Sequence, residues 1–215
     1  MSEQTIMKTV QCNQNPGYLF TKRLMDIVLS LLGLVLLSPL FLVVSFLIHR
    51  EDKGKVFFCQ ERNGLNNQVF RMYKFRSMIA DAPAMREELG KYNELDGPAF
   101  KMKHDPRITK IGAFLRKTSI DELPQLFNVL KGEMSLVGPR PLPVYETAQC
   151  NAYQLQRLLV KPGITCYWQA SGRSDISFDE WIEMDLRYIR EASIWTDIRI
   201  LFMTAGAVLA KKGAY

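Results

Sequence analysis

Histidine and cysteine are scarce in this sequence, and their arrangement argues against several kinds of site. Only two histidines, His49 and His104, are available, too few for a multi-histidine metal centre and a poor basis for a histidine-based triad. The cysteines form no Cys-x-x-Cys pair and have no nearby histidine, so they predict neither a zinc site nor a disulfide framework. They are Cys12, Cys59, Cys150 and Cys166. We expect reduced thiols in a cytosolic compartment.

Long apolar segments are also scarce. Residues 27–48 are uncharged, and 17 of these 22 residues are apolar. No other stretch reaches the roughly 18 uncharged apolar residues that a spanning helix needs, which excludes a polytopic transporter. An aromatic content of 11% excludes an intrinsically disordered chain, and the remaining residues suit one domain.

The apolar run is expected to be retained as a membrane segment. It begins too late and is too long for a cleaved signal peptide, and the charged residues 49–52 follow it. A straight helix of this length would measure about 33 Å and could span a bilayer. Ser38 and Pro39 lie near its middle, where proline gives no N–H and its ring clashes with the carbonyl of Val35, so the helix must kink or break.

Basic residues flank both ends of this segment and bear on its topology. They are Lys22 and Arg23 before it, and Arg50, Lys53 and Lys55 after it. The positive-inside rule is satisfied best if both ends stay on the cytoplasmic side and the chain turns at Ser38-Pro39. A spanning helix kinked at the proline fits the physics of the segment equally well.

The remaining sequence predicts a mostly helical α+β fold with a small β-hairpin. Strand-like runs at 56–60 and 69–75 flank the turn-rich residues 63–67, which is typical of a hairpin. Ser177 and Glu180 match a capping box at the start of a helix. Helices are predicted at 81–92, 108–116, 123–130, 144–159 and 177–191, a short strand at 164–168, and an interfacial helix at 195–212. The expected domains are a polar tail (1–18), a re-entrant membrane helix (19–50) and a cytosolic catalytic domain (51–215).

The formal net charge of +6 indicates an anionic partner. Nucleic acid, anionic lipid and phosphorylated substrates all fit this charge. A nucleic-acid binder rests on charge alone, because no recognised nucleic-acid-binding motif is present. We therefore expect no nucleic-acid partner.

Two adjacent carboxylates, Asp121 and Glu122, are the densest functional signal. They open an amphipathic helix shortly after Arg116. One interpretation is structural, since Ser119 and Glu122 match a capping box and acids in a first turn complement the helix dipole. Pro124 weakens this interpretation, because it would forfeit a hydrogen bond inside such a helix, so the helix can instead begin at Asp121.

The other interpretation of these acids is a phosphate-handling site. A helix N-terminus keeps a carboxylate ionised and favours any phosphate brought to it. A carboxylate beside a bound Mg²⁺ can attack phosphorus and form an aspartyl phosphate type of intermediate. Chemistry on a diphosphate also needs cations, and Arg116, Arg140 and Arg173 lie where turns could direct them into a cleft.

Several separate motifs follow one another along the chain in a recognisable order. They are K-F-R-S-M at 74–78, D-P-R-I-T at 105–109, D-E-L-P-Q-L at 121–126, S-L-V-G-P-R-P at 135–141, K-P-G-I-T at 161–165 and S-G-R at 171–173. In these motifs the chain resembles the monotopic phosphoglycosyl transferases of the bacterial sugar transferase family over residues 19–215. Longer members add an N-terminal multi-span region, whereas this chain looks like the catalytic part alone.

The resemblance implies a reaction and a role for each site residue. A sugar-1-phosphate is transferred from a UDP-sugar to undecaprenyl phosphate through a covalent aspartyl-phosphosugar intermediate, and UMP is released. Asp121 is the implied nucleophile, and Glu122 helps to hold Mg²⁺, with both carboxylates as candidate metal ligands. Arg116, Arg140 and Arg173 match positions that contact phosphates.

The resemblance also bears on the membrane and on the sugar. Ser38-Pro39 matches the family's helix-break-helix signature, which favours the re-entrant topology at the cytoplasmic face of the bacterial inner membrane. The C-terminal residues 211–215 resemble members that start exopolysaccharide or O-antigen (lipopolysaccharide) synthesis with galactose or glucose. Cys166 and Tyr167 replace small residues of the family, a departure in the sugar or nucleotide pocket. A two-fold homodimer is compatible with a surface-lying enzyme.

A non-catalytic, membrane-anchored scaffold that binds polyanions or partner enzymes is the alternative function. The adjacent acids beside three arginines favour the transferase, because a scaffold has no need of them.

Overall fold

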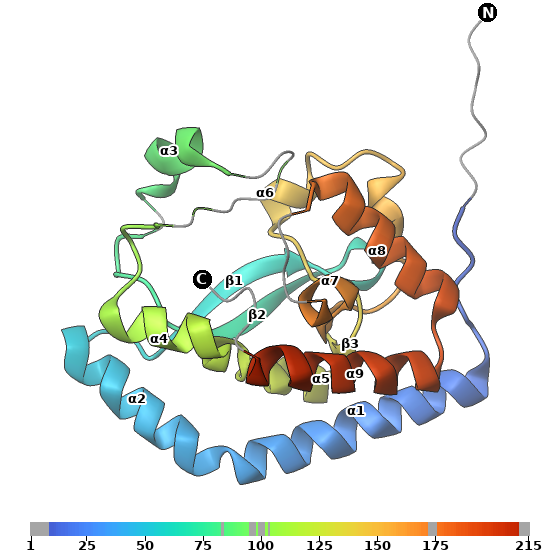
Figure 1. Cartoon of the computed structure of the whole chain (residues 1–215), viewed down its shortest axis with the longest axis horizontal. Helices are drawn as coiled ribbons and strands as arrows, with labels where there is room; N and C mark the ends of the chain where they lie inside the picture. The colour runs from blue at the N-terminus through green and yellow to red at the C-terminus, as the bar shows by residue number, and fades with distance from the viewer. Residues whose placement is uncertain are drawn as a thin grey trace, which may run out of the picture.

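The computed structural model describes residues 9–82, 84–94, 98, 102, 104–171 and 176–210. In this part of the chain, helices surround two small sheets (Figure 1). The helices are α1 (Pro16–Leu36), α2 (Ser38–Asp52), α3 (Arg86–Leu89), α4 (Lys110–Thr118), α5 (Gln125–Lys131), α6 (Val144–Thr147), α7 (Tyr167–Ala170), α8 (Phe178–Glu191) and α9 (Ile194–Leu209). The strands are β1 (Phe57–Asn63), β2 (Val69–Phe75), β3 (Ser135–Val137) and β4 (Gly163–Thr165). Short 3₁₀ turns are η1 (Leu65–Asn67), η2 (Gly90–Tyr92), η3 (Ile120–Glu122) and η4 (Gln154–Leu159).

The apolar segment forms a bent pair of helices rather than one straight helix. No single helix in the described residues is long and apolar enough to cross a membrane, but α1 and α2 together meet that criterion with a bend of 60°. The break lies at Ser38-Pro39, as the sequence predicts. The Ser38 hydroxyl donates to the Val35 carbonyl at 2.8 Å, which satisfies the acceptor that the proline cannot reach with an N–H.

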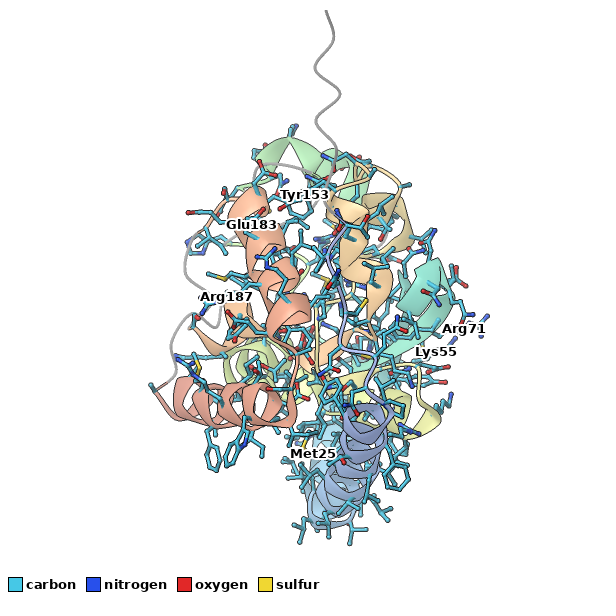
Figure 2. The ribbon with its side chains drawn as sticks, turned by 90° about the vertical axis from the view of Figure 1, so that its right-hand side faces the viewer. Met25, Lys55, Arg71, Tyr153, Glu183 and Arg187 are labelled. Carbon is cyan, nitrogen blue, oxygen red and sulfur yellow. The ribbon has the colours of Figure 1, made fainter. Side chains whose placement is uncertain are left out.

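The polarity of α1 is inverted relative to a helix of a soluble domain, whereas α2 buries the apolar Val44 and Ile48. Asp26 and Ser30 are buried against the rest of the protein, whereas Leu36 and Leu42 are 76% and 75% exposed. The two helices run beneath the rest of the molecule in Figure 1, and Figure 2 shows Met25 on α1 at the opposite end from Tyr153 and Glu183. Polar groups turned toward protein and leucines turned outward are typical of a helix in lipid.

Asp26 fixes α1 to the second sheet. Its carboxylate accepts hydrogen bonds from the Ser135 hydroxyl at 3.0 Å and from the Leu136 amide at 2.9 Å. Arg23, one turn earlier, donates to the carbonyls of Val129 and Leu130 at the end of α5. The helix α1 is thereby joined to the helix that follows Asp121 and Glu122.

The β-hairpin prediction is confirmed. β1 and β2 pair antiparallel from Phe57–Phe75 to Asn63–Val69, and Asn66 and Asn67 take the positive φ angles of the turn. A second sheet, in which β3 and β4 pair in parallel, was not predicted as a pair. The capping box of Ser177 and Glu180 at the start of α8 is also confirmed.

Two helix predictions are wrong in extent. The helix expected at 144–159 is two pieces, α6 and η4, because Asn151 accepts a hydrogen bond from the Gln154 amide and so caps a new turn. The helix expected at 81–92 is reduced to α3 and η2.

The main core lies between α5, the second sheet and α8. Val129, Val137, Leu186 and Ile189 are fully buried there, and Ile200 of α9 joins them. A smaller cluster of α2, α4 and β2 residues includes Val44, Phe75 and Leu115. The segment that carries Asp121 and Glu122 links α4 of the smaller cluster to α5 of the main core.

Candidate active site

Asp121 and Glu122 lie in the short segment that connects α4 to α5. α4 ends at Thr118, Ser119 takes a left-handed conformation with φ 58°, and the 3₁₀ turn η3 carries both acids. The capping-box interpretation of Ser119 and Glu122 is wrong, because the Ser119 side chain makes no capping hydrogen bond. α5 begins at Gln125, and Pro124 occupies the cap position, where a missing N–H costs little.

The Asp121 carboxyl is buried, with 6% of the residue exposed. Burial raises its pKa, and the adjacent Glu122 acts in the same direction, whereas Lys74, Arg116 and Arg140 favour the ionised form. Among the described residues, no hydrogen-bond donor reaches the Asp121 carboxylate. Within that part of the chain, the Asp121 carboxylate oxygens accept no hydrogen bond.

The Glu122 carboxylate, in contrast, is surrounded by donors. Lys74 contacts Oε1 at 2.8 Å, and Gln169 donates to Oε2 at 3.4 Å. Both terminal nitrogens of the Arg140 guanidinium contact the same carboxylate, with Nη1 3.2 Å from Oε2. These contacts occupy both oxygens, so Glu122 holds the cations around Asp121 in place.

Lys74 and Gln169 belong to the site although sequence reasoning did not assign them to it. The sequence predicts only that Lys74 belongs to a strand, within residues 69–75. In the structure it projects from β2, and burial lowers its pKa against the opposing effect of Glu122. Gln169 comes from α7, a helix of four residues that sequence periodicity cannot reveal.

Two of the three predicted arginines are described at the site. Arg140 contacts Glu122 directly, whereas Arg116, in the last turn of α4, donates from Nε to the Ser77 hydroxyl at 3.1 Å. Arg116 nevertheless influences the charge state of Asp121. The third, Arg173, lies outside the described residues.

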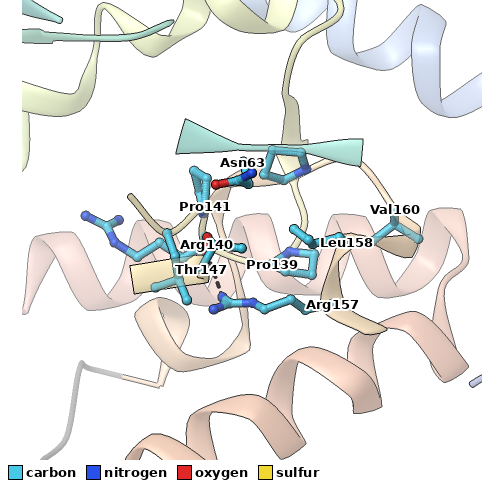
Figure 3. A pocket seen from close by; sticks show the side chains of 10 residues that line it. Asn63, Pro139, Arg140, Pro141, Thr147, Arg157, Leu158 and Val160 are labelled. Atoms are coloured by element: carbon cyan, nitrogen blue, oxygen red, sulfur yellow. Dashed lines mark hydrogen bonds between the residues drawn. The ribbon is translucent and has the colours of Figure 1, made fainter. Parts of the chain in front are cut away.

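A small pocket lies behind the segment that carries Arg140 (Figure 3). Its walls include residues of β1, of the proline-rich segment after β3, of α6 and of η4. They include Asn63, Pro139, Pro141, Thr147, Arg157 and Leu158. The pocket therefore borders the backbone that positions Arg140.

The donor set suits a Mg²⁺ ion bound together with a phosphorylated substrate. No group of three or more histidine, cysteine or acidic side chains that could hold a metal occurs in the described residues. Mg²⁺ is commonly held by one or two carboxylates plus substrate phosphates, so such a group is not required. Asp121 has oxygens to offer, and Glu122 would first have to release one of its cationic partners.

The arrangement combines a buried carboxylate that no donor reaches within the described residues with an array of cations. Lys74 and Arg140 touch Glu122, and Arg116 lies in the helix just before Asp121. Such an array can neutralise a diphosphate while the carboxylate attacks phosphorus. Strongly perturbed groups packed together in this way are typical of catalytic sites.

Comparison with known proteins gives matches to sugar transferases of bacteria. The sequence profile of the family described as "Bacterial sugar transferase" matches residues 17–211. The galactosyl transferase CpsE of Streptococcus agalactiae is 50% identical over 201 residues, which cover 92% of this chain and 44% of that protein. The undecaprenyl-phosphate galactose phosphotransferase of Salmonella typhimurium is 44% identical, and the match covers 91% of this chain and 42% of that protein.

A shorter relative matches over most of its own length. The exopolysaccharide production protein ExoY of Rhizobium meliloti is 39% identical over 198 residues, which cover 90% of this chain and 88% of ExoY. The chain thus spans less than half the length of CpsE and of the Salmonella protein, and nearly all of ExoY.

Proposed function

The chain belongs to the bacterial sugar transferase family, and from this we propose that it is a phosphoglycosyl transferase acting on undecaprenyl phosphate. It transfers a hexose-1-phosphate, galactose or glucose, from a UDP-sugar and thereby begins the synthesis of a polysaccharide. The names of its relatives support this, since they include galactose and glucose phosphotransferases. The donor nucleotide and the covalent intermediate are part of the proposal.

The observation that carries the proposal is the difference between the two neighbouring acids. Glu122 accepts contacts from Lys74, Arg140 and Gln169, whereas no donor among the described residues reaches Asp121. A nucleophile needs a free lone pair, and a carboxylate fully engaged by donors is a weaker one. Asp121 is therefore the nucleophile, and Glu122 organises the cations.

The reaction then proceeds in two displacements at one phosphorus atom. An Asp121 oxygen bonds to the sugar-linked phosphorus, and the bond from that phosphorus to the bridging oxygen breaks, so UMP leaves. A phosphate oxygen of undecaprenyl phosphate next attacks the same phosphorus and breaks its bond to Asp121. The products are an undecaprenyl diphosphate sugar and the regenerated carboxylate.

Cationic side chains and a metal ion together neutralise the negative charge of the UDP-sugar phosphates. Arg140 and Lys74 stand where they can neutralise phosphate oxygens while the carboxylate approaches, which lowers the repulsion between anions. Mg²⁺, held by Asp121 or Glu122 and by the donor phosphates, would supply a Lewis acid that stabilises the departing UMP. Arg116 and Arg173 are assigned to further phosphate contacts.

The bent helix pair gives the enzyme access to its lipid acceptor. The phosphate of undecaprenyl phosphate lies at the membrane surface, so a site on a domain attached to one face can reach it. We place both ends of α1–α2 on the cytoplasmic face of the bacterial inner membrane, with the helices entering and leaving one leaflet. The outward leucines and the basic flanks support this topology.

The test is a donor panel with the full chain in detergent or nanodiscs. We expect UMP release with UDP-galactose or UDP-glucose when undecaprenyl phosphate and Mg²⁺ are present, and loss of release with EDTA that added Mg²⁺ restores. The Asp121→Asn variant should release no UMP while it stays folded and membrane-bound. A protein inactive with every donor would instead support the scaffold, and full activity of Asp121→Asn would exclude Asp121 as the nucleophile.

A further inference from the structure

The backbone that carries Arg140 depends on donors from outside its own segment. The sequence Pro139-Arg140-Pro141 cannot form regular structure, because its prolines have no N–H groups. The carbonyl of Pro139 accepts from the Gly163 amide at 3.0 Å, and the carbonyl of Leu142 accepts from the Asn63 amide at 3.2 Å. The carbonyls of Arg140 and Pro141, which lie between these two, accept hydrogen bonds from side chains.

Two arginines supply these donors from opposite sides. Arg62, at the end of β1, donates from Nη1 to the Pro141 carbonyl at 2.6 Å. Arg157, in η4, donates from Nη2 to the Arg140 carbonyl at 2.6 Å, the contact drawn in Figure 3. Every carbonyl from residue 139 to residue 142 is thus held by a donor from another element.

Arg157 itself contacts two residues of α8. Its side chain forms an ion pair with Asp185 of α8 at 2.6 Å, and the two side chains are 3% and 1% exposed. The guanidinium lies over the Trp181 ring at 5.2 Å, and Trp181 stacks on Trp168 at 4.7 Å. Replacing a buried ion pair by apolar side chains of similar volume is often neutral or stabilising in proteins, so such a pair is weak evidence for a purely stabilising role. It does provide a charged donor with a fixed direction.

We propose that Arg157, oriented by Asp185, is a positioning residue that sets the guanidinium of Arg140 against Glu122. At the site, Arg157 contacts the backbone carbonyl of Arg140, and the Arg140 side chain contacts Glu122. Arg62 supports the same segment from the other side. The inference rests on the proposed function for its kinetic consequences, but its structural claim concerns the segment 138–142 alone.

The first test is a double-mutant cycle on UMP release. Arg157→Lys keeps the charge but loses the guanidinium that faces Asp185 and the Trp181 ring, and Asp185→Asn loses the opposing charge. We expect each to lower kcat at least tenfold. In the Arg140→Lys background, Arg157→Lys should cost less than threefold more, because both changes act through the same side chain. The matched control is Arg187→Lys, which changes an exposed arginine paired with Glu191 and should leave kcat within twofold.

The second test does not depend on activity. The amides that hydrogen-bond the segment 138–142 to its surroundings are those of Gly138, Gly163 and Asn63. Their hydrogen exchange should be at least fivefold faster in Arg157→Lys than in the wild type or Arg187→Lys. If Arg157→Lys fails to fold, Arg62→Lys tests the same segment from β1 and should also accelerate this exchange.

The outcomes separate the two proposals. A wild type that releases no UMP from any donor overturns the proposed function, and the exchange rates then decide the role of Arg157. Unchanged exchange of the Gly138, Gly163 and Asn63 amides overturns the positioning role. So does a loss of kcat from Arg157→Lys that is equally large with and without Arg140→Lys, because that result is expected of a merely structural residue.

Discussion

Arg140 meets Glu122 in a two-point contact, in which Nη1 and Nη2 of the guanidinium face the two oxygens of the carboxylate. Glu122 lies in the short segment that connects α4 to α5, and Arg140 lies in the proline-rich segment after β3. Their contact closes the site around Asp121. Within the part of the chain that the structure describes, Asp121 rather than Glu122 is the acid whose oxygens accept no hydrogen bond.

Replacing Arg140 by lysine should reduce activity although the charge is kept. A lysine offers one point of contact where arginine offers a planar fork, so a charge-assisted hydrogen bond worth about 1.5–3 kcal/mol is lost. We expect kcat/KM for UMP release to fall by roughly ten- to a hundredfold, since about 1.4 kcal/mol corresponds to a factor of ten. Steady-state kinetics measure this, with Arg187→Lys as the control. An Arg140→Lys enzyme within twofold of the wild type would show that the two-point contact is unnecessary.

Removing Lys74 should shift the pH dependence of the reaction. Lys74 lowers the pKa of Asp121, which burial raises. Without this cation the pKa of Asp121 rises further, so the nucleophile becomes protonated at higher pH. In Lys74→Met the acidic limb of kcat/KM should therefore move to higher pH. Profiles from pH 5 to pH 9 measure it, and Lys110→Met, which changes an exposed lysine of α4, should not move the limb. A limb that moves to lower pH would contradict the electrostatic assignment.

Replacing Asp121 by asparagine should stabilise the protein at neutral pH while it abolishes activity. The folded-state pKa of Asp121 is raised above the unfolded value of 3.8, so ionisation disfavours the folded state at pH values above both. Below the unfolded pKa the aspartate is protonated in both states and this penalty is absent. The melting temperature of Asp121→Asn should exceed that of the wild type at pH 8, and the difference should shrink toward pH 4. A variant that is less stable at pH 8 would show that the ionised carboxylate stabilises the fold.

The re-entrant topology predicts that both ends of the helix pair face the same side. In a variant without its native cysteines, Gln14→Cys and Lys53→Cys should react with an impermeant maleimide in inverted membrane vesicles and not in intact spheroplasts. Both residues are exposed, one before α1 and one after α2. Reaction of Gln14→Cys in spheroplasts, with Lys53→Cys still protected, would establish a kinked spanning helix.

The sequence predicts those parts of the site whose residues are neighbours in the chain. Asp121 and Glu122 are adjacent, and Arg140 lies between two prolines, so the local sequence pattern is enough to identify them as candidate site residues. Lys74 and Gln169 reach Glu122 from a strand and from a four-residue helix that are almost a hundred positions apart along the chain. No local pattern joins them, because their proximity is created by tertiary packing.

The same distinction applies to the fold. The break at Pro39 and the capping box at Ser177 are local effects of single residues, and the structure confirms both. The interruption of the 144–159 helix depends on the Asn151 side chain competing for the backbone, which a pattern of apolar positions does not register. The buried Asp26 is likewise explained only by β3, which supplies its two hydrogen-bond donors.

The most direct test of the central claim is to trap the sugar phosphate on the protein. The full chain is incubated with Mg²⁺ and the active UDP-hexose without undecaprenyl phosphate, and is then quenched, digested and analysed by mass spectrometry. We predict that the peptide containing Asp121 gains the mass of a hexose phosphate in an amount equal to the UMP released. The adduct should disappear when undecaprenyl phosphate is added, and it should be absent from Asp121→Asn. An adduct on Glu122, or UMP release that requires the acceptor and leaves no adduct at any time, would contradict the assignment of Asp121 as the nucleophile.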